Sequence, residues 1–376
     1  MLPDELVVGQ VRVGPADAVD LLGLARAQRL ADPGPLSLIT KLRGSVQFWH
    51  GELRSGRNSF SEARDLLAHS TDVEAPVGAW LGLAWACLYM GTVEEGLDLA
   101  EEAIAICHGD LSRGVQSLGY SGLLRNLLTR GQLLALAGRL EAGKAEVNNA
   151  LALVREHRQT ELKAWGFPIL AHLAYMAGDG EAGLALAEEA RRLSVDIGNR
   201  FTLILALEAM GIAQLAEGRP QEAQASLTQA LDEARTHRCG LSDEASVLAH
   251  LAEAHHAARE LTAARLVADE AVETARRQGA RILACLALII RAQVLRASGG
   301  EEAAVLTDLE AAMALVHETG ALTYEPFIHE EIGRLRGDES ELRESLRLYR
   351  AIGAIGHARR LGTQLGPVLP AVPPAK

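Results

Sequence analysis

A turn followed by a helix recurs along this chain at intervals of about 40 residues, and this period constrains the fold more than any other feature. The clearest copy is EGRPQEAQASLTQAL, residues 217–231, in which a Gly-Arg-Pro turn opens a helix. Ala223, Leu227 and Ala230 recur there at positions i, i+4 and i+7, so one helix face is small and apolar. Such a face is typical of the second helix of an α-helical hairpin. We place the same turn at Asn58, Gly91, Gly138, Gly178, Gly218, Arg259, Gly299 and Gly337.

A second set of glycines follows several of these turns by about 20 residues, where each second helix should end. Glycine enters the left-handed backbone region there without strain. These glycines are Gly198, Gly240, Gly279 and Gly320. A period shared by both helices predicts an all-α solenoid of about eight helix-turn-helix repeats, in which each repeat contacts its neighbours.

The period divides the chain into three parts. Residues 1–35 fit it poorly: Gly14-Pro15 can start a helix to about Ala31, the remnant of a truncated repeat, and residues 32–35 (DPGP) should end it. Residues 36–366 form the repeat domain, with an insertion at 108–121 and a kink or restart at Pro168. Residues 354–365 should cap the stack, and the Pro-rich tail 367–376 should be disordered. Five regular first helices are expected near 122–137, 161–177, 200–217, 242–258 and 281–297.

Composition narrows the classes of partner. Hydrophobic residues make up 48% of the chain but aromatic residues only 4%, so Ala and Leu must build the core. A net charge of −12 argues against a surface that coats phosphates, and we expect no direct contact with nucleic acid. The four cysteines are scattered without C-x-x-C spacing, as in the core of a cytoplasmic protein. The longest apolar run, residues 282–290, falls well below the roughly 20 residues that span a bilayer, so no membrane partner is expected.

Two glycine-rich stretches imitate nucleotide-binding motifs without the required context. Gly138 to Ala145 nearly spells a P-loop, but Ala145 replaces the Ser or Thr that would bind Mg²⁺, and a helix precedes it. Gly178 to Gly183 matches GxGxxG, again after a helix and not a strand. We interpret both as turns between helices.

Metal and catalytic motifs are equally incomplete. Glu253 and His256 form the E-x-x-H pair of di-iron bundles, but no neighbouring helix offers the second pair that such a site needs. His329 lacks the second histidine of a zincin helix, and Ser121 lacks the second glycine of a nucleophile elbow. We therefore predict no catalytic residues, no metal and no cofactor, and do not expect an enzyme.

The side-chain pattern resembles the tetratricopeptide repeat, whose plain form has 34 residues. Met210-Gly211 stands where that family has Leu-Gly, and Ala223, Leu227 and Ala230 fill its three packing positions. The resemblance implies a right-handed superhelical solenoid with a C-terminal capping helix, whose first helices line a concave groove. Other matching sets are Trp80, Leu83 and Ala84, then Leu248, Leu251 and Ala252, then Ala264, Ala268 and Ala271.

Glycine replaces the alanine that opens the second helix at Gly96, Gly143 and Gly183. Glycine inside a helix costs about 1 kcal/mol relative to alanine. We therefore expect alanine at position 143 to be tolerated or stabilising.

The same resemblance selects candidate partner-binding residues. Trp85 and Tyr89 lie one helical turn apart on an expected first helix and are the favoured pair. The inserted segment adds Arg113, Gln116 and Tyr120, because long loops are often functional. Core packing is the alternative for the aromatic residues, since large apolar side chains on packed helices are usually buried.

From residue 248 onward the chain resembles, more specifically, the C-terminal repeat region of large bacterial signalling proteins. In these, a class III adenylate or guanylate cyclase domain, or a LuxR-type DNA-binding domain, accompanies a STAND-type ATPase. The matching stretches are LAHLAEAHHAARELTAARLVADEAVETARRQGAR, EPFIHEEIGRLRGD and LRLYRAIGAIGHARRLG.

Two functions compete. The first is a non-catalytic interaction module that binds a protein, a peptide or a small inducer in its concave groove, in bacterial signalling or transcriptional regulation. The second is the sensor part of a cyclase- or ATPase-containing regulator, which would act allosterically on an enzyme outside this chain. No cyclase motif, intact P-loop or helix-turn-helix is present in the sequence. Those activities are therefore not assigned to this chain.

Overall fold

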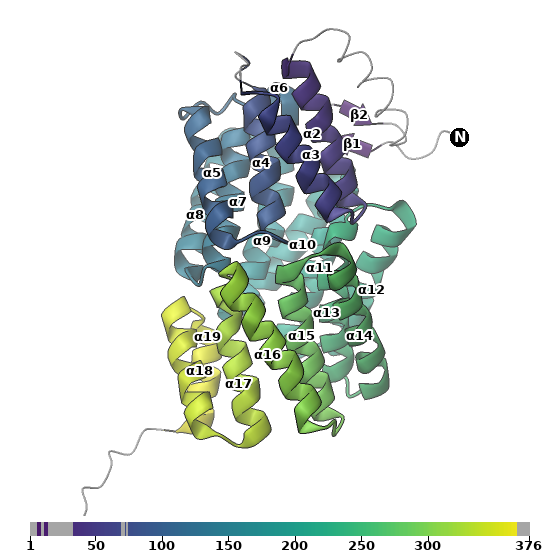
Figure 1. The fold of residues 1–376 in the computed structure, drawn as a ribbon, viewed down its shortest axis with the longest axis vertical. Coiled ribbons are helices and arrows are strands. Elements are labelled where there is room, and N and C mark those ends of the chain that lie inside the picture. Colours follow the sequence, from purple (N-terminus) through teal and green to yellow (C-terminus); the bar gives the residue numbers. More distant parts are fainter. Residues whose placement is uncertain (1–5, 9–10, 14–32, 69–71, 73, 367–376) are drawn as a thin grey trace, which may run out of the picture.

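The computed structural model describes residues 6–8, 11–13, 33–68, 72 and 74–366. From Pro33 onward these residues form a stack of eight helical hairpins, each made of a first and a second helix (Figure 1). The first helices are α2 (Pro33–Trp49), α4 (Ala75–Cys87), α7 (Gly122–Leu136), α9 (Thr160–Ala177), α11 (Arg200–Ala216), α13 (Glu244–Ala257), α15 (Arg281–Ala297) and α17 (Glu325–Arg336). The second helices are α3 (Leu53–Asp65), α5 (Val93–Cys107), α8 (Leu140–Glu156), α10 (Gly180–Ile197), α12 (Pro220–His237), α14 (Leu261–Gln278), α16 (Glu302–Thr319) and α18 (Glu339–Ile352).

Shorter elements complete the fold. The capping helix α19 (Ile355–Leu365) packs on α18, and the short helix α6 (Val115–Leu118) lies in the inserted segment. Two 3-10 turns, η1 (Leu241–Asp243) and η2 (Leu322–Tyr324), precede α13 and α17. The expected all-α solenoid of eight repeats with a capping helix is confirmed. An antiparallel pair of short strands, β1 (Leu6–Val8) and β2 (Val11–Val13), was not expected. The helix predicted over 14–31 and the tail 367–376 lie outside the described residues.

Small residues allow the helices of a hairpin to approach closely. Ala223, Leu227 and Ala230 are fully buried, as their spacing predicts. A Cβ atom at Gly211 would lie 2.4 Å from Cγ of Leu227, so glycine is required at this crossing of α11 and α12. These contacts explain why the tetratricopeptide-like pattern repeats along the chain.

The expectation for position 143 is wrong. A Cβ atom at Gly143 would lie 2.4 Å from the backbone oxygen of Gly131, which cannot move without shifting α7. The corresponding Cβ atom at Gly183 would have no neighbour closer than 3.4 Å, an ordinary van der Waals distance. Glycine is therefore needed at the first position and dispensable at the second.

The turns follow the predicted period, with one correction. Asn58 lies inside α3, and the turn between α2 and α3 contains Gly51, with φ of 78°, 40 residues before Gly91. The neighbouring Gly56 is a packing residue, since its Cβ atom would lie 2.9 Å from the backbone oxygen of Gly44. Gly91 lies in its predicted turn without positive φ. The predicted glycines that adopt positive φ are Gly138, Gly178, Gly198, Gly218, Gly240, Gly279, Gly299, Gly320 and Gly337.

Two proline predictions also change. Pro33 and Pro35 lie in the first turn of α2, where proline is tolerated because it needs no backbone N–H there. Helix α9 continues through Pro168, so the predicted restart does not occur. The first described helix of the stack thus includes residues 33–35, and hairpin 4 keeps one unbroken first helix.

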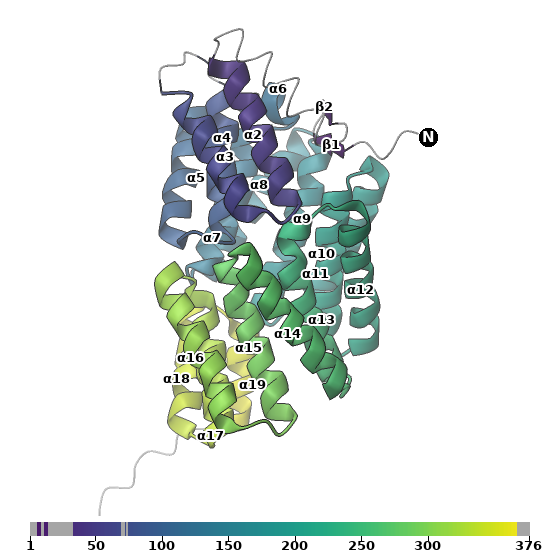
Figure 2. The same cartoon turned by 45° about the vertical axis from the view of Figure 1, so that its right-hand side comes forward.

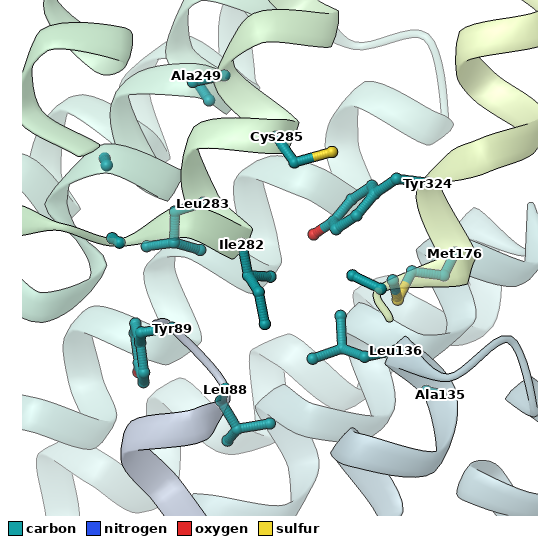
Figure 3. Packing of buried hydrophobic residues seen from close by; sticks show 14 of the residues in the cluster. Leu88, Tyr89, Ala135, Leu136, Met176, Ala249, Ile282, Leu283, Cys285 and Tyr324 are labelled. Carbon is teal, nitrogen blue, oxygen red and sulfur yellow. The ribbon is translucent and has the colours of Figure 1, made fainter. Parts of the chain in front are cut away.

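Contacts between distant hairpins fold the stack back on itself, so that hairpins 1–3 lie against hairpins 6–8 (Figures 1 and 2). The backbone nitrogen of Ile282 donates to the carbonyl oxygen of Tyr89 at 3.0 Å. Nε2 of His357 lies 3.2 Å from the carbonyl oxygen of Tyr175. Leu88 and Leu136 from early hairpins face Ile282 and Tyr324 from late ones (Figure 3).

The first helices form the inner layer of this closed stack. Helix α13 is buried without a break over residues 244–252, whereas its partner α14 is buried only at spaced positions. A helix that is apolar on all sides belongs to the interior, and one with a single apolar face belongs to the surface. All four cysteines are buried free thiols. Among the described residues, no helix is both long and apolar enough to cross a bilayer.

Candidate ligand-binding interior

Three cavities lie along the inner layer of first helices. The main cavity, of about 570 Å³, is lined by residues of α9, α11, α13, α15, α17 and α19. The middle cavity, of about 130 Å³, adjoins it, since His172, Met176 and Tyr324 line both. The upper cavity, of about 40 Å³, lies among α2, α4, α7 and α9. The main cavity has the volume of a site for a drug-sized molecule or a short peptide segment.

A hydrogen-bonded group centred on Glu253 lines one side of the main cavity. The Tyr175 hydroxyl lies 3.1 Å from both carboxylate oxygens of Glu253, and Nδ1 of His250 lies 3.3 Å from Oε2. His250 is 1% exposed, and its Nε2 atom has no partner among the described residues. That buried nitrogen is available to hydrogen-bond a ligand, as donor or acceptor according to its tautomer.

His172 faces the same group from α9, and its ring lies 6.2 Å from that of His250. Burial, with the nearby His250, lowers the pKa of His172 to about 4. His172 is therefore neutral at pH 7, and its ring contributes an aromatic surface to the wall of the main cavity. Within the described residues, no group of three or more His, Cys, Asp or Glu side chains is placed to hold a metal ion.

An ion-pair network closes the other side of the main cavity. Glu330 accepts hydrogen bonds from Nη1 and Nη2 of Arg360, at 2.7 and 2.8 Å, and from the Tyr349 hydroxyl at 2.8 Å. Burial alone would raise the pKa of Glu330, but the hydrogen bonds and charge of Arg360, helped by Arg334, hold it below its ordinary value. Nε of Arg296 donates to Glu331 at 2.9 Å. Three arginines thus surround two carboxylates, and with Glu253 on the opposite side the cavity has three arginines and three carboxylates.

The middle cavity contains two buried carboxyl groups on different helices. Asp243 accepts a hydrogen bond from the Tyr89 hydroxyl at 2.9 Å, and Glu208 accepts one from the Ser246 hydroxyl. Burial, followed by the charge of Asp243, raises the pKa of Glu208, and burial also raises the pKa of Asp243. These groups lie where early and late hairpins meet.

The predicted site residues separate into two groups. Trp85 and Tyr120 both line the upper cavity, and Tyr89 lines the middle cavity. Trp85 is 9% exposed, and its ring lies 6.1 Å from that of Tyr89. Arg113 and Gln116 line none of the three cavities, and Arg113 pairs with Asp110 at 3.5 Å. Their role in partner binding stays a prediction.

Sequence reasoning missed most residues of the main cavity. Glu253 and His256 were considered only as metal ligands, and His172, Arg334 and Arg360 were not considered. One signal was present: ionisable residues occur on helices whose other residues are apolar on every side, as in α9 and α13. The two nucleotide-like motifs lie in the turns between α7 and α8 and between α9 and α10, as expected.

No protein-family model matches this sequence, and no curated protein is similar to it. Solved structures share its fold. A Rap protein complexed with Competence and Sporulation Factor is 12% identical, with a TM-score of 0.62, over 88% of this chain and 90% of that chain. NprR in complex with its cognate peptide NprX is 14% identical, with a TM-score of 0.56, over 85% and 91%. The APC/C hetero-tetramer Cut9-Hcn1 is 14% identical, with a TM-score of 0.50, over 87% of this chain and 64% of that chain. The chain therefore has a tetratricopeptide-like helical-repeat fold.

Proposed function

We propose that this chain is a non-catalytic regulatory module that binds a peptide segment in the main cavity. The observation that carries the proposal is the cavity itself: about 570 Å³, lined by consecutive first helices, with the unpartnered Nε2 of His250 in its wall. A buried polar nitrogen without a partner is costly unless a ligand or water satisfies it. The fold is shared with NprR, whose solved complex contains a cognate peptide.

The lining matches the mixed chemistry of a peptide. Leu286, Ile289 and Phe327 offer apolar surface for side chains. Gln293 and Arg334 offer hydrogen-bond donors for backbone carbonyl groups. A small inducer of similar size would use the same groups, and competition with a bound peptide would identify it.

We further infer that binding is transmitted to a partner outside this chain, in a cytoplasmic signalling or transcriptional pathway. The resemblance of residues 248–365 to the repeat regions of cyclase-, LuxR- and STAND-type regulators supports this proposal. Most residues of the main cavity belong to that same segment. Peptide binding would then alter the contacts between early and late hairpins, and through them an attached or associated effector.

The proposal is tested by panning a phage-displayed library of short random peptides on the immobilised full-length chain. Enriched peptides are synthesised, and their affinity is measured by isothermal titration calorimetry. Leu286→Trp fills the main cavity and should weaken binding by about tenfold or more. Leu266→Trp is the matched control, because Leu266 lies on the outer helix α14 and is 67% exposed. Equal affinities for both variants, or a library without enriched peptides, would refute the proposal.

A further inference from the structure

The upper cavity contains two buried cations and no carboxylate to balance them. Lys41 on α2 and Arg125 on α7 both line it and are 6% and 4% exposed. Neither forms an ion pair with a carboxylate among the residues that the structure describes. The buried carboxylate of Glu330, by contrast, is paired with Arg360. Charges removed from water are normally compensated by a partner of opposite sign.

Arg125 is held in place by neutral groups. Its Nη1 atom donates to Oγ1 of Thr129 at 2.6 Å, and its guanidinium carbon lies 4.5 Å from the centre of the Trp165 ring. Tyr120 lines the same cavity. These contacts orient the guanidinium group but leave its charge uncompensated. The same charge acts on Lys41, since burial and then Arg125 lower the pKa of Lys41 to about 8.

The rest of the cavity wall also offers donors without acceptors. Trp49 and Trp165 are 8% and 7% exposed, and neither indole Nε1 has a hydrogen-bond partner among the described residues. A buried N–H group without an acceptor is rare in native proteins, and it indicates a ligand or water at that place. Two cations and two free N–H donors around one cavity form the complement of a small oxyanion.

We propose that the upper cavity is a binding site for a carboxylate group, held between Lys41 and Arg125. The cavity volume of about 40 Å³ exceeds the roughly 10–15 Å³ that one water needs, so it has room for a carboxylate with little attached to it. The apolar wall of Leu81 and Phe60 favours a carbon-bearing acid over a fully hydrated anion. The carboxylate can belong to a free short-chain acid or to the end of a larger ligand. The site does not involve the main cavity and does not depend on the function proposed for it.

Tryptophan fluorescence gives a direct readout of this site. Three of the four tryptophans of the chain, Trp49, Trp85 and Trp165, line the upper cavity. In the full-length Trp80→Phe variant every remaining indole therefore reports on it. Replacing chloride by acetate at constant ionic strength should change the emission saturably and raise Tm by about 2 °C or more. N-acetyl-Ala-Ala and its C-terminal amide form a second pair of probes, which tests the end of a larger ligand.

Lys41→Met keeps the length of the side chain and removes its charge. We expect this variant to fold, as judged by circular dichroism, and to lose both responses to acetate. Lys144→Met is the matched control, because Lys144 lies on the outside of α8 and pairs with Glu141 at 3.6 Å. Arg125→Gln is a second variant that should also abolish the response, and Leu286→Trp should retain it.

A response to acetate identifies a free acid as the ligand class, and a response to the acetylated dipeptide but not its amide identifies a chain end. Both outcomes support the site. Responses that are absent, or that persist equally in Lys41→Met and Lys144→Met, overturn it.

Discussion

The hydroxyl of Tyr89 donates a hydrogen bond of 2.9 Å to Oδ1 of Asp243, although 154 residues separate them in the chain. Tyr89 follows α4 in hairpin 2, and Asp243 precedes α13 in hairpin 6. The carbonyl oxygen of the same tyrosine accepts the backbone N–H of Ile282 at 3.0 Å. One residue thus joins an early hairpin to two late ones. A ligand that moved the late hairpins would have to strain or break these contacts.

Tyr89→Phe removes only the hydroxyl group and leaves the ring contacts intact. Asp243 would keep its hydrogen bond from Ser242 but lose one buried donor. We expect the free energy of unfolding to fall by about 1–3 kcal/mol, the cost of an unsatisfied buried polar group. Urea unfolding followed by circular dichroism measures the change. A midpoint equal to that of the wild type would show that this bond does not hold the hairpins together.

Glu208 makes stability depend on pH. Burial and the charge of Asp243 raise its folded pKa above the ordinary value of 4.5, so the folded state holds a proton that the unfolded chain releases. The stabilisation is complete below pH 4.5 and is lost as pH rises through the folded pKa. We expect the free energy of unfolding to decrease between about pH 5 and pH 8.

Glu208→Gln keeps the shape of the side chain and removes its titration. The decrease between pH 5 and pH 8 should become smaller in this variant, measured by urea unfolding at each pH. Parallel profiles for wild type and variant would mean that Glu208 does not titrate in this range.

Much of the fold was predictable because it depends on local patterns. The buried face of Ala223, Leu227 and Ala230 and the positive φ of Gly218 both follow from neighbouring residues. A period of about 40 residues then predicts eight copies of this hairpin along the chain. The prediction failed at Asn58, which lies inside α3, whereas the turn that continues the period contains Gly51.

The closure of the stack and the cavities were not predictable in this way. Tyr89 and Asp243, from hairpins 2 and 6, meet only because small rotations between successive hairpins add up to a closed superhelix. No pattern of neighbouring residues in the sequence specifies how these rotations add up. The sequence selected Trp85 and Tyr120 as aromatic candidates, and the structure places both on the upper cavity. Their contribution to partner binding stays a prediction.

Gly143→Ala and Gly183→Ala test the packing of equivalent glycines in two second helices. The first places Cβ 2.4 Å from the backbone oxygen of Gly131, and overpacking of this kind costs about 1–3 kcal/mol. The second meets nothing closer than 3.4 Å, so the higher helix propensity of alanine should stabilise by up to about 1 kcal/mol. Thermal unfolding of both variants measures the difference. Similar Tm values would contradict the close approach of α7 and α8.

Lys41 should also make the free energy of unfolding depend on pH. Its effect occurs at alkaline pH and is opposite in sign to that of Glu208. Its folded pKa of about 8 lies below the ordinary value of 10.5, so the unfolded chain binds more protons between these two values. The contribution of Lys41 to the free energy of unfolding should therefore rise from pH 8 to pH 10.5, by roughly 3 kcal/mol for a shift of this size. The buried cysteine thiols contribute with the opposite sign in this range, because burial raises their pKa. The titratable groups facing Lys41 do not interfere, because Arg125 stays charged and burial raises the pKa of Tyr120 to about 12.

The comparison with Lys41→Met isolates this effect from every other titrating group. Below pH 8 the variant should be more stable than the wild type, because it lacks an uncompensated buried charge. Toward pH 10.5 the two should converge as Lys41 in the wild type loses its proton. Saturating acetate should reduce the difference at pH 7 by pairing with the charged lysine in the wild type alone. A Lys41→Met protein less stable than the wild type at pH 7, without acetate, would show that a partner within the chain already balances Lys41.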